Sequence, residues 1–586
     1  MAIHGFVDWK GKPINKKRHG GARAASFIFT QTILLNFAFI PILLNLVTYL
    51  HGTMNEDIAN SSTLVNNLVG ASCAFALLGA FISDSYITRF KTILIFGPIE
   101  LMGYGLLSLQ AHLPSLHPPH CNINDQGENC QKVHGWNSFL LYVGLYMLAL
   151  GDGCVRASSP SLGADQFDGE DPVEVIERTS FFNSYAFGIS LGGLIGLILL
   201  VWIQNNKGWD IGFGVSALSV LLSVLVVASG FPCYRNQIPD GSPLARTLQV
   251  LVAAFRKRNA SMPENPEDLN KTPQNGTNEV EVLSHTQGFK QCSDNVIRFI
   301  DKAAIVGEHE SDIGPWSLST VTQVEETKIV LRMIPIIISS ILGNIPNGLI
   351  LSFTVQQGTT MDTRLGKIRI SPANLFVIPI FFQTVMLLVY DRSIVPFLRR
   401  ITGYTGGITH LQRVAIGFLF VGFATCAAAV IENRRMKIVE ENGLQNMTTG
   451  VPMSVFWLMV QYCCLGVVDV TSFVGLLEFF NSEAPRGMKS IGTAIFWCVL
   501  GLAAFLGSIT VELTNKASRH GTSGRGWIEG NNLNKSHLDY FYWLLCFMQI
   551  LALLNFIFWA RRYTYRQNLH IQEGNLQSQS RVMAAI

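Results

Sequence analysis

An aspartate and an arginine interrupt a long apolar stretch of the chain, "FLLYVGLYMLALGDGCVRASSPSLG". Asp152 and Arg156 are four residues apart, so on a helix they share one face, where the carboxylate can neutralise the cation. A guanidinium offers a planar fork of donors to a carboxylate or a nitrate ion, and it stays protonated in proteins. The spacing therefore predicts a cation that is neutralised within its own helix. A purely structural pair is the alternative.

Other candidate groups inside apolar stretches are few. A charged side chain within a membrane costs roughly 2.5–3.5 kcal/mol on insertion scales, and it usually faces a cavity or a partner. Three further acids lie well inside such stretches, namely Glu100, Asp469 and Glu478. All thirteen histidines lie outside the apolar stretches or at their ends, so we expect no histidine relay or ligand deep in a membrane.

Motifs of soluble enzymes find little support. The stretch "GISLG" at 188–192 matches the G-x-S-x-G nucleophile elbow, but that elbow needs a strand-to-helix turn, and this match lies within an apolar stretch. Gly188, Gly192 and Gly196 are spaced four apart, which predicts the close approach of a neighbouring helix. There is no phosphate-binding loop or HExxH motif, and the eleven cysteines lack metal-ligand spacing. We therefore expect no catalysis, no cofactor and no bound metal.

Membrane-spanning helices are the elements predicted to position these residues. Only 14% of the 586 residues are charged and 49% are hydrophobic, whereas soluble domains average about 25% charged residues. A bilayer core about 30 Å thick needs roughly 20 apolar residues at 1.5 Å each. The predicted fold class is an all-α polytopic membrane protein with twelve transmembrane helices in two six-helix halves. The twelve stretches lie at 25–50, 62–83, 92–110, 137–160, 181–203, 211–231, 329–354, 373–391, 411–431, 453–480, 491–513 and 539–560.

A polar stretch separates the two halves. It includes "RKRNASMPENPEDLNKTPQNGTNEVEV", which cannot bury much apolar surface and reads as a linker. Just before it, "PLARTLQVLVAAFRKR" has helical periodicity and predicts a helix lying on the membrane surface. The predicted segments are a cytosolic N-terminus (1–24), a first six-helix half (25–232), a cytosolic linker (233–328), a second six-helix half (329–562) and a cytosolic tail (563–586).

Lysine and arginine placement predicts the orientation. Six basic residues precede the first span, whereas the loops after the first, third and fifth spans carry only Lys132 and Lys207. Both termini are therefore expected in the cytosol, although "MDTRLGKIRI" places three basic residues on the predicted outer side. Cys121 and Cys130 share the outer loop after the third span, where either a disulfide or two free thiols would fit.

Short charged turns on the cytosolic side predict a conformational latch. The turn "GAFISDSYITRFK" after the second span contains Gly79, Asp84 and Arg89, and the turn after the eighth span contains Asp391 and Arg392. An acid and a base close together in such turns can hold neighbouring helices in one state and release them in another. Ordinary positive charge on the cytosolic side is the alternative explanation.

Eight stretches make the sequence similar to one family of proteins. The chain resembles the plant nitrate transporter 1/peptide transporter family, in the proton-dependent oligopeptide transporter branch of the major facilitator superfamily. The stretches run from the fourth span to the twelfth, which together with the latch covers most of the chain. They are "GADQFD", "SFFNSYAFGISLGG", "DNVIRFIDKAAI", "WSLSTVTQVEETK", "TVQQGTTM", "GITHLQRVAIG", "LLEFFNSEAP" and "LDYFYWLL".

This resemblance implies which residues line a central cavity between the first, fourth, seventh and tenth spans. Proton-coupled relatives usually carry two acids and a base in the first span, facing a lysine in the fourth. The first-span positions correspond here to Thr32, Leu35 and Asn36, so both acids are absent. The lysine position corresponds to Arg156, and the resemblance assigns the acidic position of the tenth span to Glu478.

By this resemblance, substrate binding falls to Arg156, Glu478, Asn347 and Asn36, with Asp152 as the charge partner of Arg156. Glu478 would lie opposite the fourth span as a gating or proton-sensitive counter-charge. Because the first-span acids are missing, we expect proton coupling to be weak or absent, with any residual pH sensitivity at Glu478.

The predicted function is the transport of a small anionic solute by alternating access. Nitrate, a plant hormone, a peptide or a specialised metabolite would fit the family. The alternative is a membrane receptor or scaffold that keeps the carrier fold without transport. The expected partners are the solute and the lipid bilayer, without nucleic acid, and the expected location is the plasma membrane or the vacuolar membrane. The sequence does not specify an oligomeric state.

Overall fold

The computed structural model describes most of the chain between residues 6 and 565. Cys121, Cys130 and much of the predicted linker lie outside the described residues, so the cysteine pair stays a prediction. The gaps in the description are 9–10, 16–17, 56–57, 119–134, 169–170, 239–242, 260–297, 306–315, 363, 366–367, 370–376, 405, 447–449, 485–487, 520–525, 529–532 and 564.

Twelve membrane-spanning segments are long and apolar enough to cross a bilayer, as the sequence predicted. The eighth and tenth segments each contain a π-helical turn, Tyr390–Ile394 and Asp469–Phe473. The single-helix spans are α1 (Gly21–Gly52), α2 (Ile58–Ser85), α3 (Arg89–His112), α4 (Trp136–Ala164), α5 (Pro172–Asn206), α6 (Trp209–Ser229), α10 (Val321–Thr360), α13 (His410–Glu441), α16 (Lys489–Ser518) and α17 (Leu538–Arg562). The eighth span joins α11 (Val377–Val389) to α12 (Val395–Thr402), and the tenth joins η8 (Val455–Leu458) and α14 (Met459–Val468) to α15 (Val474–Glu483).

Most of these helices are longer than the apolar stretches that predicted them, and polar capping residues set the start of several. Thr320 and Gln323 form a capping box at the start of α10, and Thr409 and Gln412 form another at the start of α13. Each box satisfies backbone N–H groups that the first turn leaves unpaired. A hydropathy window sees only the apolar middle of such a helix, which explains why the predicted limits were too short.

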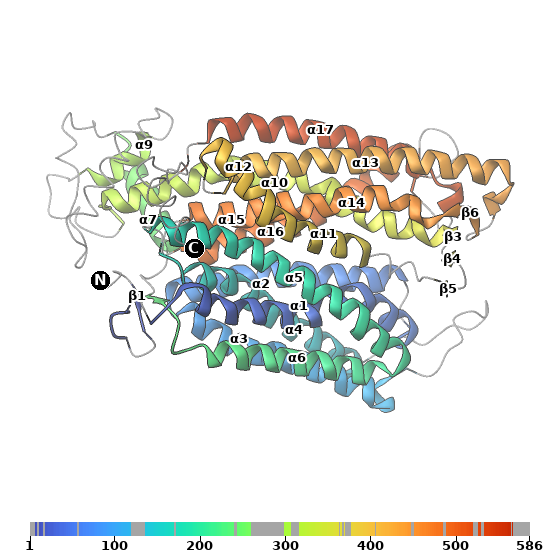
Figure 1. Cartoon of the computed structure of the whole chain (residues 1–586), viewed down its shortest axis with the longest axis horizontal. Coiled ribbons are helices and arrows are strands. Elements are labelled where there is room, and N and C mark those ends of the chain that lie inside the picture. The colour runs from blue at the N-terminus through green and yellow to red at the C-terminus, as the bar shows by residue number, and fades with distance from the viewer. Residues whose placement is uncertain are drawn as a thin grey trace.

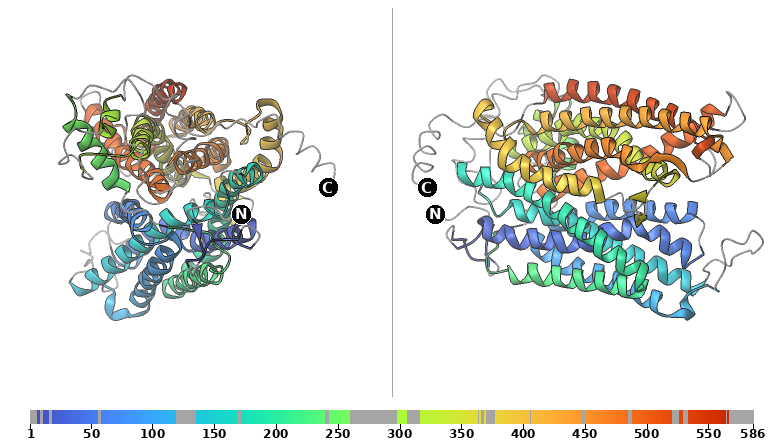
Figure 2. Two further views of the ribbon diagram at one scale, coloured as in Figure 1. Left: turned by 90° about the vertical axis from the view of Figure 1, so that its left-hand side faces the viewer. Right: turned by 45° about the vertical axis from the view of Figure 1, so that its right-hand side comes forward.

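The spans form two groups, α1 to α6 and α10 to α17, which lie side by side with their axes along the length of the molecule (Figures 1 and 2). Contacts between the groups run mainly through α2 with α16 and through α5 with α11. We call the side on which α1 begins and α17 ends the near side, and the opposite side the far side. The near side lies at the left in Figure 1.

Glycines let α5 pack closely on α1. A Cβ atom on Gly192 would lie 2.3 Å from the carbonyl oxygen of Ile33, and one on Gly196 would lie 2.4 Å from that of Phe37. Neither distance is possible for a real side chain, so the small residues are required where the two backbones meet. The close packing predicted from the glycine spacing is confirmed, and GISLG lies within a continuous helix.

The described part of the linker forms a small cluster on the near side. A helix is present where the sequence predicted one, α7 (Pro243–Arg256). Its apolar face, including Val250 and Ala254, is buried against Ile300 and against Val324 of α10. A second apolar segment of the linker thus covers this face, whereas Leu248 and Phe255 of α7 are exposed. The prediction that the helix lies on the membrane surface stays a prediction.

The remaining elements are short. The 3₁₀ turns are η1 (Pro114–Leu116), η3 (Lys302–Ala304), η7 (Leu444–Asn446) and η11 (Leu533–Lys535), and α9 spans Arg298–Asp301. Strand β1 (Phe6–Val7) pairs antiparallel with β2 (Asn236–Gln237), joining the N-terminal segment to the end of the first half. The other pairs are β3 (Met361–Asp362) with β6 (Val451–Ser454), in parallel, and β4 (Arg364–Leu365) with β5 (Ile368–Arg369), antiparallel.

Candidate functional site

The Asp152–Arg156 pair forms within α4 as its spacing predicts. Arg156 Nη2 donates a 2.7 Å hydrogen bond to Asp152 Oδ1, and Nε lies 3.2 Å from both carboxylate oxygens. The Arg156 guanidinium also lies 4.4 Å from the ring centre of Phe39 in α1 and 4.7 Å from that of Trp497 in α16. One cation thus contacts both halves of the molecule, stacked between two aromatic rings.

Arg156 has hydrogen-bonding capacity that Asp152 does not use. Asp152 takes up Nε and Nη2, and Nη1 has no hydrogen-bond partner among the described residues. The Arg156 side chain is 13% exposed, compared with 4% for Asp152. The free edge of the guanidinium is therefore available to a ligand, while Asp152 balances its charge.

Glu100 of α3 lies beside this pair and has no such compensation. It is fully buried, and within the described part of the chain neither carboxyl oxygen has a hydrogen-bond partner. A Cβ atom on Gly151 would lie only 2.4 Å from Glu100 Cβ, so the acid packs directly against α4 at the residue before Asp152. Sequence reasoning placed Glu100 within a span, but its contact with α4 required the packing of two helices.

Glu478 contacts α13, and its role opposite the fourth span stays a prediction. Its Oε2 atom is 3.5 Å from His410 Nδ1 and 3.6 Å from Arg413 Nη1, both on α13, and no described contact joins it to Arg156. The second half approaches Arg156 through Trp497 instead. The π-helical turn Asp469–Phe473 precedes Glu478 and widens the helix by one residue, so every later side chain is rotated relative to a regular α-helix.

Among the described residues, no hydrogen bond joins the predicted asparagines to Arg156. Asn36 is buried in α1, and its Nδ2 donates to the carbonyl oxygen of Thr32 one turn earlier (2.8 Å). Asn347 is half-buried in α10. Both positions lie on spans that the resemblance places around the central cavity, and their roles in substrate binding stay predictions.

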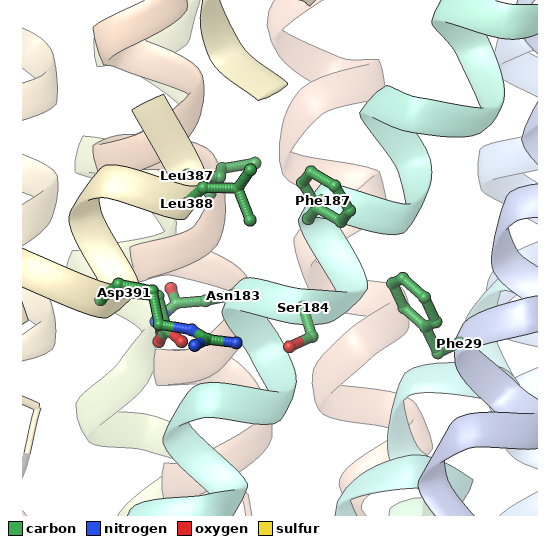
Figure 3. A pocket seen from close by; sticks show the side chains of 8 residues that line it. Phe29, Asn183, Ser184, Phe187, Leu387, Leu388 and Asp391 are labelled. Atoms are coloured by element: carbon green, nitrogen blue, oxygen red, sulfur yellow. Dashed lines mark hydrogen bonds between the residues drawn. The ribbon is translucent and has the colours of Figure 1, made fainter. Parts of the chain in front are cut away.

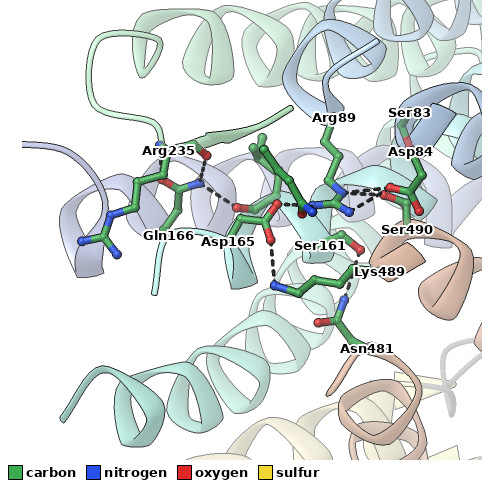
Figure 4. A network of polar contacts seen from close by, with 12 residues as sticks. Ser83, Asp84, Arg89, Ser161, Asp165, Gln166, Arg235, Asn481, Lys489 and Ser490 are labelled. Carbon is green, nitrogen blue, oxygen red and sulfur yellow. Dashed lines mark hydrogen bonds and ion pairs between the residues drawn. The ribbon is translucent and has the colours of Figure 1, made fainter. Parts of the chain in front are cut away.

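The first predicted latch is a buried network that joins the halves on the near side (Figure 4). Arg89 Nη2 donates to Asp84 Oδ1 (2.8 Å), and Arg89 Nε donates to Ser490 Oγ at the start of α16 (2.7 Å). Asp84 Oδ2 accepts from the backbone N–H of Ile491 (3.0 Å). A Cβ atom on Gly79 would lie 2.4 Å from Cys154 Cα, so glycine lets the end of α2 press against α4.

Asp165, just after α4, extends this network. It pairs with Arg89 and, at 2.9 Å, with Lys489 of α16. Burial opposes ionisation of this carboxyl, but Arg89 and Lys489 together hold the pKa of Asp165 below its usual value. Its contribution is therefore complete at neutral pH and is lost only as the pH falls through that lowered pKa. Neutral or mildly acidic conditions leave this part of the network intact.

The second predicted latch also joins the halves, but only one of its two residues takes part. Asp391 accepts hydrogen bonds from Ser180 Oγ (2.9 Å) and Asn183 Nδ2 (2.8 Å), both on α5. Arg413 Nη2 donates to Asn183 Oδ1 from the other side (2.9 Å). Arg392 is exposed and has no ion-pair partner among the described residues. The polar residues of "SFFNSYAF" supply the missing half of this contact.

These contacts lead to the first test, an Asp84→Asn variant. The change preserves shape but removes the charge that holds Arg89, and hydrogen bonds to charged groups contribute about 1.5–3 kcal/mol. We expect roughly a tenfold or larger shift toward a conformation open on the near side. Spin labels at the exposed near-side residues Lys91 and Arg400 would report it as a longer distance in pulsed electron paramagnetic resonance.

Glu177→Gln is the matched control, since Glu177 is an exposed acid on the near end of α5. It should leave the distance distribution unchanged. If the Asp84→Asn protein shows the same distribution as this control, Asp84 does not act as a latch.

Comparison with known proteins finds relatives that match almost the whole chain. Residues 90–528 match the family described as PTR2, POT family. From Arabidopsis thaliana, Protein NRT1/PTR FAMILY 4.6 is 36% identical over 578 residues, covering 96% of this chain and 97% of that protein. Protein NRT1/PTR FAMILY 4.5 is 38% identical over 563 residues and covers 96% of each chain.

Solved structures show the same fold at low sequence identity. An auto-inhibited POT family peptide transporter superposes with a TM-score of 0.60 at 19% identity, over 94% of this chain and 99% of that one. The POT family transporter PepTSo gives a TM-score of 0.60 at 18% identity, over 93% and 98%. With its twelve membrane-spanning segments and near full-length relatives, the chain belongs to the POT family, among the NRT1/PTR membrane transporters.

Proposed function

We propose that this transporter carries a small anionic solute by alternating access and that Arg156 binds the negative charge of the solute. The observation that carries the proposal is the free Nη1 edge of a guanidinium that is balanced by Asp152 and contacts both halves. A charge in a spanning helix usually faces a cavity or a partner, and here the partner leaves part of the charge accessible.

The local geometry favours a planar anionic group. The guanidinium presents parallel N–H donors that match a carboxylate or a nitrate ion. Phe39 and Trp497 flank it, so the body of a bound solute would meet aromatic surface next to its charged end. A planar carboxylate on an apolar body and an inorganic planar anion both fit this description.

Alternating access requires the near side to open. In this conformation it is closed by contacts between the halves, which include Asp84 with Ile491, Asp165 with Lys489 and Asp391 with Asn183. We propose that opening breaks these contacts together and exposes Arg156. A solute on Arg156 would contact Phe39 and Trp497 of opposite halves, which links binding to the movement of one half against the other.

We further propose that proton coupling is weak or absent. No carboxylate stands at Thr32, Leu35 or Asn36 of α1. Asp152 is bonded to Arg156, a cation that stays charged. The near side is proposed to face the cytosol, in either the plasma membrane or the vacuolar membrane, because the first half carries its basic residues there.

Uptake and efflux in a heterologous cell test this proposal. The solutes are nitrate, carboxylate plant hormones and short peptides, each at two external pH values. Epitope tags on both termini, probed before and after permeabilisation, report the orientation. We expect movement of at least one anion, tags accessible only after permeabilisation, and loss of movement in Arg156→Gln.

Arg434→Gln is the control variant for this assay. Arg434 is exposed on α13 and lies 4.3 Å from the ring centre of Trp457, so it is also an arginine on an aromatic ring but lies outside the site. Movement of neutral or cationic solutes alone would contradict an anion carrier. Equal loss of solute movement in both variants would show that Arg156 does not bind the solute.

A further inference from the structure

A cavity of about 210 Å³ lies between the two halves, and Arg156 is not among the residues that line it (Figure 3). Its walls come from α1 and α5 of the first half and from α11 with the following π-helical turn of the second half. The lining residues are Phe29, Asn183, Ser184, Phe187, Leu387, Leu388, Asp391 and Arg392.

The cavity is bordered by exposed residues of membrane-spanning segments. Leu388 is 48% exposed, and Ser184 and Arg392 are also exposed, although all three belong to membrane-spanning segments. Exposed residues on the outside of a span face lipid. The 32 residues of α1 extend about 48 Å, compared with about 30 Å of hydrocarbon. Phe29, about 12 Å from the start of α1, therefore lies near the boundary between head groups and acyl chains.

The chemistry of the lining is apolar inside and cationic at the rim. The rings of Phe29 and Phe187 stack with their centres 6.3 Å apart, and Leu387 and Leu388 face them. Both carboxylate oxygens of Asp391 already accept hydrogen bonds, from Ser180 and Asn183. Among the described lining residues, the charge left without a partner is the guanidinium of Arg392.

We propose that this lateral cavity binds an anionic phospholipid of the near-side leaflet, with its phosphate on Arg392 and part of an acyl chain along Phe29, Phe187 and Leu387. The volume suits part of a chain, since pockets that enclose drug-sized molecules measure roughly 300–1,000 Å³. The bound lipid contacts both halves beside the Asp391–Asn183 hydrogen bond, so it stabilises the conformation that is closed on the near side. This inference does not depend on the identity of the transported solute.

The test uses the purified full-length protein in detergent, titrated with dioleoyl phosphatidylglycerol, dioleoyl phosphatidylcholine or inorganic phosphate. Native mass spectrometry measures retained lipid, and thermal unfolding measures stabilisation. We expect wild-type protein to retain and be stabilised by phosphatidylglycerol in preference to phosphatidylcholine. Arg392→Gln should lower that preference roughly fivefold, the effect of one arginine at an anionic surface.

Arg400→Gln is the matched control, because Arg400 is an exposed arginine two turns later that does not line the cavity. It should keep the wild-type preference, and Arg392→Lys should keep most of it. Ser184→Trp places a large side chain in the cavity and should abolish retention of both lipids. This variant replaces Arg392→Gln as the test if Arg392→Gln does not fold. The proposal is overturned if wild type retains both lipids equally, if inorganic phosphate stabilises as well as phosphatidylglycerol, or if Arg400→Gln loses as much as Arg392→Gln.

Discussion

An Asp152→Ala variant should lose both stability and transport, a far larger effect than the removal of one small side chain suggests. The substitution leaves the Arg156 guanidinium without a counter-charge inside the membrane. Breaking a buried ion pair by removing one partner typically costs about 3–5 kcal/mol, out of a total stability of roughly 5–15 kcal/mol. The measurements are thermal unfolding in detergent and uptake of the anion that the wild-type protein carries.

The chain offers a control pair with the same spacing and distance. Glu512 and Lys516 of α16 are also four residues apart and 2.7 Å from each other, but both side chains are more than 60% exposed. Glu512→Ala should leave stability nearly unchanged, because solvent screens an exposed pair. The double variant Asp152→Ala/Arg156→Met should recover stability without transport, because it removes the uncompensated charge together with the proposed anion-binding group. Equal losses in Asp152→Ala and Glu512→Ala would contradict the proposed role of the pair.

Acid outside the cell should fail to drive accumulation of the solute against its concentration gradient. Proton coupling needs a group that changes charge between the two sides of the membrane, and α1 has no acid at the positions where coupled relatives carry them. The measurement is solute accumulation at clamped voltage with an imposed pH gradient, beside a known proton-coupled carrier in the same cells. Robust accumulation would show that another acid couples transport to protons. Glu100 and Asp469 would then be the first residues to mutate.

Any remaining pH sensitivity should come from Glu478 and its surroundings. Glu478 faces His410 and Arg413 of α13, and the His410 ring lies against Tyr565. Glu478 is thus a buried carboxyl group beside two basic side chains of the second half. In the same assay, Glu478→Gln should flatten the residual pH profile at unchanged expression. A profile that survives the substitution would place the titrating group elsewhere.

Much of the fold was predictable because it depends on short-range rules. The count of twelve spans follows from apolar length alone, and the Asp152–Arg156 pair follows from the geometry of one helical turn. The glycine spacing in α5 predicted a close helix contact for the same reason. Each of these features depends on residues that are neighbours along a single helix.

The features that sequence reasoning missed depend on which helices meet. Trp497 contacts Arg156 from a span more than 300 residues later, and nothing in its local sequence marks that contact. Lys489 pairs with Asp165, which is likewise distant from it in the sequence. The orientation of Glu478 depends on a π-helical turn earlier in its span, which hydropathy along the sequence does not reveal. Hydrophobic periodicity predicts a buried face but does not identify the partner.

The π-helical turn of the tenth span also makes a contact between α13 and the tenth span insensitive to most substitutions. Its altered hydrogen bonding leaves the carbonyl oxygen of Val470 to accept from Arg413, at 3.2 Å from Nε and 2.7 Å from Nη2. A carbonyl oxygen is present whichever amino acid occupies position 470. Substitutions at that position therefore preserve the hydrogen bond provided that the π-helical turn is kept. Comparing side chains between relatives would overlook this contact, whereas a single inserted or deleted residue in the turn would abolish it.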